Sequence, residues 1–421
     1  MNAPQRISDF STANPHALTT ILEASQTKSI IASRDIFDIA GTKLWARDQP
    51  VSGALQRKLI DRKLRNPLES CLMAENGVTA QTLQTAAQAQ IDADTPLGRL
   101  LRRHGAKVLR EVEHLPVHSV AQLLLTASES ARPDTFSHAV QAMALSGALM
   151  IEHGGGTPEV RIAMLCGLLH DLGEMYIDPR FGEADADRAL DFASYQQLVV
   201  HPHVGHLLIA QLTDYPATIA RAVAEHHERL DGSGYPHALQ RDALSPLGRL
   251  LAVAEGTLGV LRGERPSLAR ASIALRVVPG EYELGWVGAI ADAARALPAL
   301  SAEHSVADVR ARLARLDGAL HVAKERFDEL ALSAESQALK SALVLALHLL
   351  ERLRTGWYAS GLWSNEVLQA QDAGEVEAVE AELLFRLRAI ERVTCLRAGE
   401  LLPDEAQRLQ GVCDMFRQLD A

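Results

Sequence analysis

The sequence predicts a mainly α-helical protein with a small mixed α/β module at its N-terminus. Aromatic residues make up only 4% of the 421 residues, whereas alanine, leucine, glutamate and arginine recur throughout, and these residue types favour helices. Apolar side chains recur at helical spacing over residues 306–332 and 376–393. A strand-like pattern occurs over residues 29–48, where β-branched residues around Ala40-Gly41 predict two short strands joined by a turn.

The length of the chain predicts two or three domains. We expect an N-terminal module of short strands and helices over residues 1–114, with Ser52 as the N-cap of a helix that follows the strands. A central domain over residues 115–275 contains most of the histidines, and a helical region over residues 276–421 completes the chain.

Glycine and proline residues indicate where helices of the central domain begin and end. The segment HGGGTPEV over residues 153–160 ends one helix, and Pro158 stands where the first turn of the next can begin. That next helix, over residues 157–171, is apolar almost all round, so we expect it to be buried. In the C-terminal region, a loop over residues 360–366 is expected to separate two helices.

Charge and cysteine content exclude several classes of function. A formal net charge of -11 argues against a nucleic-acid binder that neutralises phosphates along a broad surface, but permits a small anionic ligand in a local pocket. No apolar window of about 18 residues occurs, so we expect a cytoplasmic protein without membrane insertion. The cysteines are widely spaced and predict buried thiols in a reducing compartment rather than disulfides or a zinc ribbon: Cys71, Cys166, Cys395 and Cys413.

Histidines and acids suited to metal binding gather within residues 138–255. Each histidine alone is more often a hydrogen-bonded core residue, and a buried acid needs a partner. Together these side chains can satisfy one another around metal, whereas Cys166 is expected to pack in the core, and His203 and His206 are expected to lie outside the ligand set. The candidate ligands are His138, His170, Asp171, His201, His226, His227 and Glu255.

The size and chemistry of this set favour two metal ions. A carboxylate can bridge two ions while histidines complete their coordination, and nitrogen and oxygen ligands without thiolates favour iron or manganese over structural zinc. Two ions about 3.5–4 Å apart activate water and bind the oxygens of a phosphoryl group during in-line displacement. The pattern therefore predicts phosphoester hydrolysis.

Three motifs in this region resemble a known family. His170-Asp171 followed by Gly173 resembles the HD motif of metal-dependent phosphohydrolases. HPHVG over residues 201–205 and HHERLDGSGYP over residues 226–236 are similar to the HPxxG element and the extended HHExxDGxGYP signature of the HD-GYP subfamily. The resemblance covers about residues 130–270. It implies an HD-type helical bundle that binds two or three iron or manganese ions and hydrolyses cyclic di-GMP, a bacterial second messenger, to the linear dinucleotide pGpG or on to GMP.

The resemblance also implies roles for individual residues. The family's metal ligands fall on the seven candidates named above, and Asp134 is the candidate for binding a third ion. His170 and Asp171 are the implied catalytic residues, with Asp171 bridging two metals. Gly234 and Tyr235 lie in the loop that the family places beside the substrate and uses to recognise partners, including diguanylate cyclases.

At three positions the sequence departs from the family pattern, and these departures leave three hypotheses for the function. Glu174 replaces the lysine that usually lies near substrate phosphate, Glu255 replaces an aspartate, and Arg265, a candidate phosphate contact, is followed by Pro266-Ser267 where tyrosine is usual after proline. The first hypothesis is a working cyclic di-GMP phosphodiesterase. The second is a weak or inactive module that senses cyclic di-GMP or regulates a partner protein, and the third is a phosphohydrolase acting on another phosphoester. A homodimer is compatible with each.

Overall fold

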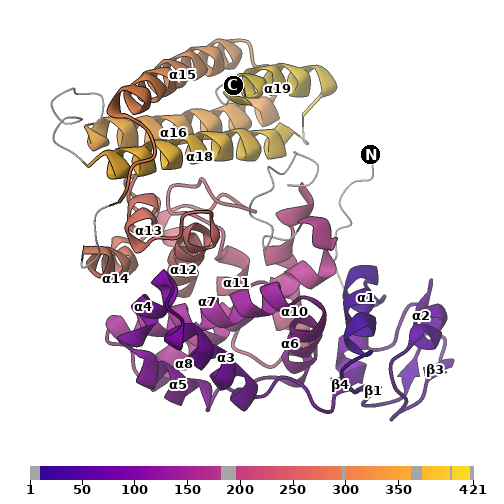
Figure 1. The fold of residues 1–421 in the computed structure, drawn as a ribbon. Helices are drawn as coiled ribbons and strands as arrows, with labels where there is room; N and C mark the ends of the chain where they lie inside the picture. Colours follow the sequence, from indigo (N-terminus) through magenta and orange to yellow (C-terminus); the bar gives the residue numbers. More distant parts are fainter. Residues whose placement is uncertain (1–9, 182–195, 296–299, 362–371, 399–400, 418–421) are drawn as a thin grey trace. The chain divides into compact units, whose positions relative to one another are not determined.

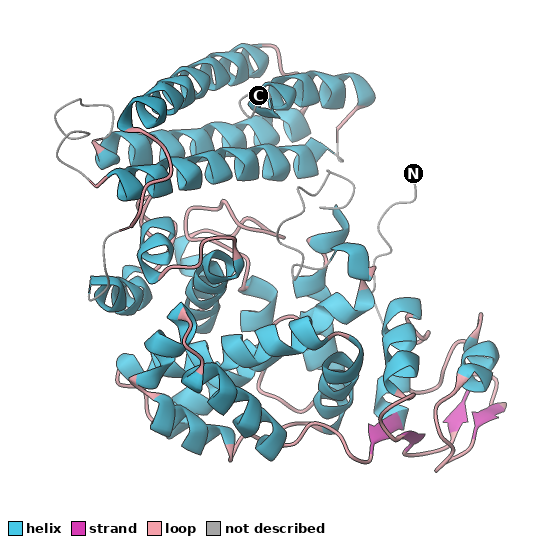
Figure 2. Ribbon diagram, viewed as in Figure 1, coloured by secondary structure: helices cyan, strands magenta, loops and turns pink. Residues whose placement is uncertain are grey.

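The computed structural model describes residues 10–181, 196–295, 300–361, 372–398 and 401–417, which are mainly helical (Figures 1 and 2). Contacts between residues divide the chain into two compact units. Unit 1 contains Met1–His226 and Ser245–Glu255, and unit 2 contains His227–Leu244 and Gly256–Ala421. The domain boundaries near residues 114 and 275 stay a prediction, because this division follows compactness alone.

The N-terminal module in unit 1 contains two small antiparallel sheets. Ala40 and Gly41 lie in the turn of the predicted hairpin, and Gly41 adopts a φ of +86°. The two strands that flank this turn pair as predicted, whereas residues 30–32 pair with a distant strand, so Ile30 is opposite Ala74. The pairs are β1 (Ile30–Ala32) with β4 (Leu72–Ala74) and β2 (Ile36–Phe37) with β3 (Lys43–Trp45).

Short helices complete this part of unit 1. Ser52 occupies the N-cap position of α2, as predicted, but its side chain makes no capping hydrogen bond. Asn14 does cap α1, since its side-chain oxygen accepts from the backbone N–H groups of His16 and Ala17. The elements are α1 (Pro15–Ala24), α2 (Gly53–Leu59), η1 (Leu68–Cys71), α3 (Ala80–Asp92), α4 (Pro96–Arg102) and α5 (Gly105–Val112).

The remaining helices of unit 1 carry the candidate ligands. Neighbouring pairs pack together, namely α7 on α8, α10 on α11, and α10 on η2. Gly167 permits the close approach of α8 to α7, because a β-carbon there would overlap the backbone carbonyl of Ala142. The elements are α6 (Ser119–Ala131), α7 (Pro133–Glu152), α8 (Thr157–Leu169), η2 (Leu172–Tyr176), η3 (Pro179–Phe181), α10 (His201–Leu212), α11 (Ala217–Glu225) and α12 (Pro246–Arg262), which continues into unit 2.

The helix boundaries predicted for this region are confirmed. Helix α7 ends directly before the HGGG segment, and Pro158 lies in the first turn of α8. The expected burial of α8 is also found, since its residues from Ala163 to Leu169 are all buried. The His170-Asp171 pair therefore follows a helix that is fixed by surrounding core.

Unit 2 contains a bundle of long helices that run side by side (Figure 1). Its core includes Phe327, Leu343 and Trp357, and the Trp357 indole N–H donates to Asp317 at 2.8 Å. The helical stripe predicted over residues 306–332 is α15, and residues 376–393 lie within α18. The elements are η5 (Arg241–Ala243), α13 (Leu268–Ala274), α14 (Leu284–Arg295), α15 (Val306–Leu332), α16 (Gln337–Ser360), α18 (Ala373–Ala398) and α19 (Pro403–Arg417).

Several other predictions can be compared with the described residues. The predicted loop begins where α16 ends, at Ser360 and Gly361, and residues 362–366 lie outside the described part. Cys71 and Cys166 are buried free thiols, whereas the side chains of Cys395 and Cys413 lie outside it. None of the helices in the described part of the chain combines the length and the apolarity needed to cross a membrane.

Helix α16 offers a matched test of the bundle core. Leu343 is 1% exposed and its neighbour Val344 is 69% exposed. Replacing Leu343 by Ala leaves a cavity, so we expect the free energy of unfolding to fall by about 2–5 kcal/mol. The control Val344→Ala should change it by less than about 0.5 kcal/mol. Urea unfolding followed by circular dichroism measures both, and equal losses would contradict the position of α16 in the bundle.

Candidate metal centre

The first group of ligand atoms comes from α7, α12 and the end of α8. The Nε2 atoms of His138 and His170 lie 3.1 Å apart. Asp171 Oδ2 lies 3.3 Å from the former and 3.0 Å from the latter. Glu255 Oε2 also approaches both, at 3.0 Å from His138 and 3.2 Å from His170. Two imidazoles and two carboxylates thus point at one buried place.

The second group lies on the other side of Asp171. The Nε2 atoms of His201 and His226 are 3.1 Å apart, and Asp171 Oδ1 lies 3.5 Å and 3.3 Å from them. The ligand atoms of these three residues all lie within 4.8 Å of one another, as do those of His138, His170 and Asp171. Asp171 therefore belongs to both groups and offers one carboxylate oxygen to each.

Backbone carbonyls orient three of the imidazoles. The Nδ1 atoms of His170, His201 and His226 lie 2.7, 2.7 and 2.6 Å from the carbonyl oxygen three residues earlier in the chain. A carbonyl can only accept, so Nδ1 carries the proton in each ring. In the neutral ring Nε2 then bears the lone pair and faces the groups described above, the arrangement that metal-binding histidines adopt.

The charges and contacts of this site fit metal ions. Nδ1 carries the proton in both rings of the His201–His226 pair, so their Nε2 lone pairs, 3.1 Å apart, cannot hydrogen-bond to each other and need a cation between them. Burial opposes a charge on His170, but Asp171 and Glu255 raise its pKa well above its usual range. Burial also opposes ionisation of Asp171, but His170 and its neighbours hold its pKa well below its usual range. The residues present therefore fit divalent metal bound beside Asp171.

His227 begins unit 2 and is held by the signature loop. It is 5% exposed, and its ring stacks on Tyr235 with centroids 4.5 Å apart and planes at 20°. The Tyr235 N–H donates to the carbonyl of His227 at 3.2 Å. Gly234 permits this return of the chain, because a β-carbon there would overlap the same carbonyl. The Gly-Ser-Gly-Tyr-Pro turn thus orients a candidate ligand.

Two buried glutamates flank the histidine pair and have structural roles that the sequence analysis missed. In unit 1, Glu225 accepts from the N–H and hydroxyl of Ser245 at 2.8 and 2.6 Å, which joins the end of α11 to the start of α12. In unit 2, Glu228 accepts from the backbone N–H groups of His237 and Leu239 at 2.7 and 2.8 Å. The sequence could have indicated these roles, because both acids adjoin the histidine pair in the segment EHHE. A buried acid needs hydrogen-bond donors.

Asp134 and Glu174 occupy different surroundings in unit 1. Asp134 is exposed in the first turn of α7, and neither ligand group found among the described residues includes it. Glu174 is buried in η2, and its backbone carbonyl accepts from Arg132 at 3.3 Å. Burial lowers the pKa of the Arg132 guanidinium, and Glu174 partly offsets this effect. The metal role of Asp134 and the substrate role of Glu174 stay predictions.

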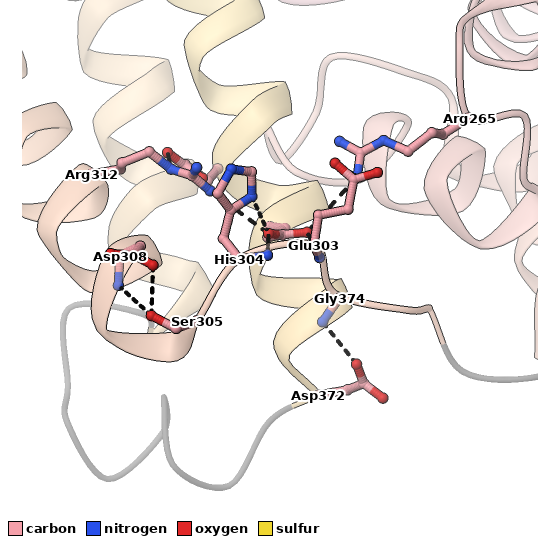
Figure 3. Close-up of polar contacts among 10 residues, drawn as sticks. Arg265, Glu303, His304, Ser305, Asp308, Arg312, Asp372 and Gly374 are labelled. Carbon is pink, nitrogen blue, oxygen red and sulfur yellow. Dashed lines mark hydrogen bonds and ion pairs between the residues drawn. The ribbon is translucent and has the colours of Figure 1, made fainter.

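Arg265 is engaged by acids of the C-terminal region (Figure 3). Its Nη1 lies 2.9 Å from Glu303 Oε2 and 3.9 Å from Glu377 Oε2. Glu377 also accepts from the backbone N–H groups of Glu303 and His304, at 3.0 and 2.7 Å. A phosphate contact by Arg265 would have to compete with these carboxylates, and that predicted role is not tested by the geometry.

Comparison with known proteins identifies the region that carries this site. The sequence model of the HD domain family matches residues 127–277, which include all seven candidate ligands. The HHExxDGxGYP signature within it is intact. These residues form an HD-GYP domain. The contacts above show why its motifs hold together, since the HD pair, His201 of the HPxxG helix and His226 of the histidine pair all contribute to the two groups around Asp171.

Curated relatives of the HD-GYP domain are cyclic dinucleotide phosphodiesterases. The chain is 28% identical over 218 residues to the cyclic di-GMP phosphodiesterase PA4108 of Pseudomonas aeruginosa, covering 52% of this chain and 50% of that one. It is 30% identical over 112 residues to the cyclic di-GMP phosphodiesterase response regulator RpfG of Xanthomonas campestris, covering 26% and 29%. It is 27% identical over 139 residues to 3'3'-cGAMP-specific phosphodiesterase 1 of Vibrio cholerae, covering 33% and 32%.

Among solved structures, the chain is similar to an HD-GYP-type protein of Bdellovibrio bacteriovorus. The TM-score is 0.36 at 16% identity, with 64% of this chain and 96% of that chain covered. The chain spans half of the Pseudomonas relative's length and about a third or less of the other two.

Gly173 provides a test of how the metal centre is assembled. A β-carbon at this position would overlap the carbonyl oxygen of His201, so Gly173→Ala should displace α10 from η2. We expect manganese affinity to fall by about 10–100-fold, the range found when groups that orient ligands are lost. Isothermal titration with manganese measures it. Gly318→Ala is the control, because a β-carbon there meets no atom within 4 Å. Wild-type manganese affinity in Gly173→Ala would contradict the close packing of η2 against α10.

Proposed function

We propose that the protein is a metal-dependent phosphodiesterase that hydrolyses cyclic di-GMP to pGpG, GMP or both. The observation that carries the proposal is the position of Asp171 between two pairs of inward-facing imidazoles. A carboxylate shared in this way suits a pair of metal ions, which is the arrangement used for in-line phosphoryl chemistry. The curated relatives support a cyclic dinucleotide as the substrate.

The residues of the HD-GYP domain would prepare the site for an anionic substrate. Two divalent ions carry four positive charges, while Asp171 and Glu255 carry two negative ones, so the loaded cluster has a net charge that attracts phosphodiester groups. The ions would supply activated water and neutralise the phosphoryl oxygens. Asp171 lies beside both pairs of histidines. The backbone carbonyls that accept from His170, His201 and His226 keep the Nε2 atoms of these rings directed inward. Burial of the ligands strengthens each of these interactions.

Finer features belong to the same proposal. We assign iron or manganese to the two ions, and Asp134 to a third ion if one binds. Gly234 and Tyr235 are proposed to contact the substrate from the signature loop, which would also be the surface for a diguanylate cyclase or another signalling protein. A homodimer and a cytoplasmic location also remain proposals.

A second function is favoured by the surroundings of Glu174. A buried carboxylate stands where the family pattern has a lysine, and Arg265 is engaged by Glu303. Both features weaken the attraction for substrate phosphate. The alternative is therefore a module that binds metal and cyclic di-GMP but hydrolyses it slowly, and acts as a sensor or protein regulator. The Vibrio relative makes 3'3'-cGAMP the second substrate to test.

Asp171→Ala tests the proposed chemistry. Loss of the shared carboxylate should remove metal from the protein and lower turnover by more than about 100-fold. Metal per chain is measured by mass spectrometry of protein loaded with iron or manganese. Turnover is measured by chromatography of cyclic di-GMP, 3'3'-cGAMP, pGpG and GMP. Asp214→Ala, at an exposed aspartate of the same unit, is the control. Hydrolysis at the wild-type rate in Asp171→Ala would refute the assignment.

Glu174→Lys separates the two functions. If the lost cation limits catalysis, the lysine variant should hydrolyse cyclic di-GMP about tenfold faster or bind it about tenfold tighter, which corresponds to about 1.4 kcal/mol. Glu174→Gln is the matched control, because it removes the anion without adding a cation. Nucleotide binding without product in the wild type and both variants would favour the sensor. Rapid hydrolysis by the wild type would rule that alternative out.

A further inference from the structure

An arginine that is mostly shielded from solvent joins the HD-GYP signature segment to the C-terminal bundle through Glu281. Arg386 lies on α18, and its side chain is 12% exposed. Its Nε donates to Glu281 Oε2 at 3.1 Å, and its Nη1 donates to Glu382 Oε2 at 2.7 Å. Its Nη2 donates to the backbone carbonyl of Ala274 at 2.8 Å. Every nitrogen of this guanidinium therefore has an acceptor, as a buried charge requires.

Glu281 transmits this contact to the signature segment. Its backbone carbonyl accepts from the N–H of Leu230 at 2.9 Å, and its Oε1 lies 4.0 Å from Arg229 Nε. The Arg229 guanidinium also lies over the ring of Tyr282, 4.8 Å from the centroid. Burial raises the pKa of Glu281 to about 7, and Arg386 acts against that rise. Arg386 thus favours the ionised form of the Glu281 carboxylate, to which Arg229 is also attracted.

Glu228, which directly precedes Arg229, binds the loop that follows the signature turn. Arg229 Nη1 donates to the carbonyl of Glu228 at 2.9 Å. The Glu228 carboxylate accepts from the backbone N–H groups of His237 and Leu239, which both follow the turn that returns Tyr235 to His227. A second bundle residue, His348 on α16, donates from Nε2 to the carbonyl of Asp231 at 3.0 Å. Helix α16 therefore binds the signature segment directly, and α18 is connected to it through Glu281.

We propose that Arg386 is a positioning residue for the phosphodiesterase site, which through Glu281 holds the HD-GYP signature segment in the conformation that orients His227 and Tyr235. This inference rests on the proposed function for its catalytic consequence. The contacts themselves predict an effect on the signature segment whether or not the protein hydrolyses cyclic di-GMP. They also give the C-terminal helices a role in the site, although they supply none of the predicted ligands.

The test compares Arg386→Met with Arg388→Met in the whole 421-residue chain loaded with manganese. Arg388 is exposed on the same helix, so it is the matched control. Hydrogen–deuterium exchange should become at least tenfold faster in peptides covering residues 228–240 of Arg386→Met, with α8 unchanged. We expect kcat to fall at least tenfold, with KM for cyclic di-GMP changed less than threefold. Arg386→Lys should restore part of kcat, because a cation again faces Glu281.

The outcomes distinguish this inference from the proposed function. Wild-type exchange over residues 228–240 in folded Arg386→Met would overturn the positioning role, whatever the activity. Wild-type protein that shows no hydrolysis would instead contradict the phosphodiesterase proposal, while the exchange experiment would still decide the positioning role. If Arg386→Met does not fold, Glu281→Gln is tested in its place. The glutamine keeps the backbone carbonyl that accepts from Leu230 but removes the negative charge that pairs with Arg386. Unchanged exchange in that variant would also overturn the inference.

Discussion

The shared position of Asp171 is the constraint on which the rest of the HD-GYP domain depends. A buried carboxylate facing four imidazole nitrogens is stable only when positive charge lies beside it. To bring those nitrogens together, the ends of α8 and α11 must meet the starts of α7 and α10 within a few ångströms. Gly167 and Gly173 make that approach possible, because any larger residue would overlap a backbone carbonyl of the neighbouring segment.

Local patterns in the sequence were sufficient to predict several helices and to single out polar residues that the structure brings together, while their role as metal ligands stays a prediction. The segment that became α8 was recognised from its apolar surface and from the glycines and Pro158 at its start. His138, His201 and Glu255 were named as candidates because histidines and acids gather within residues 138–255, and the structure brings each beside other candidate ligands. Such inferences succeed because burial and helical period are properties of a short stretch of chain.

Contacts between distant segments were not predictable in this way. The hairpin expected around Ala40-Gly41 is found as β2 and β3, but the pairing of Ile30 with Ala74 was not predicted, because nothing local specifies a partner so far along the chain. The engagement of Arg265 by Glu303 was missed for the same reason. Glu225 and Glu228 were visible as acids beside the histidine pair, but their backbone donors become apparent only once the chain is folded.

The carbonyl contacts of His170 and His226 have a consequence for how such sites arise. Each of these residues immediately follows the last residue of a helix, where a carbonyl three positions earlier no longer accepts a bond from a continuing helix. The helix terminus itself therefore selects the tautomer and aims the ring, without recruiting another side chain. For protein design, a histidine placed directly after a helix is a pre-oriented ligand, and extending that helix by one turn would abolish it.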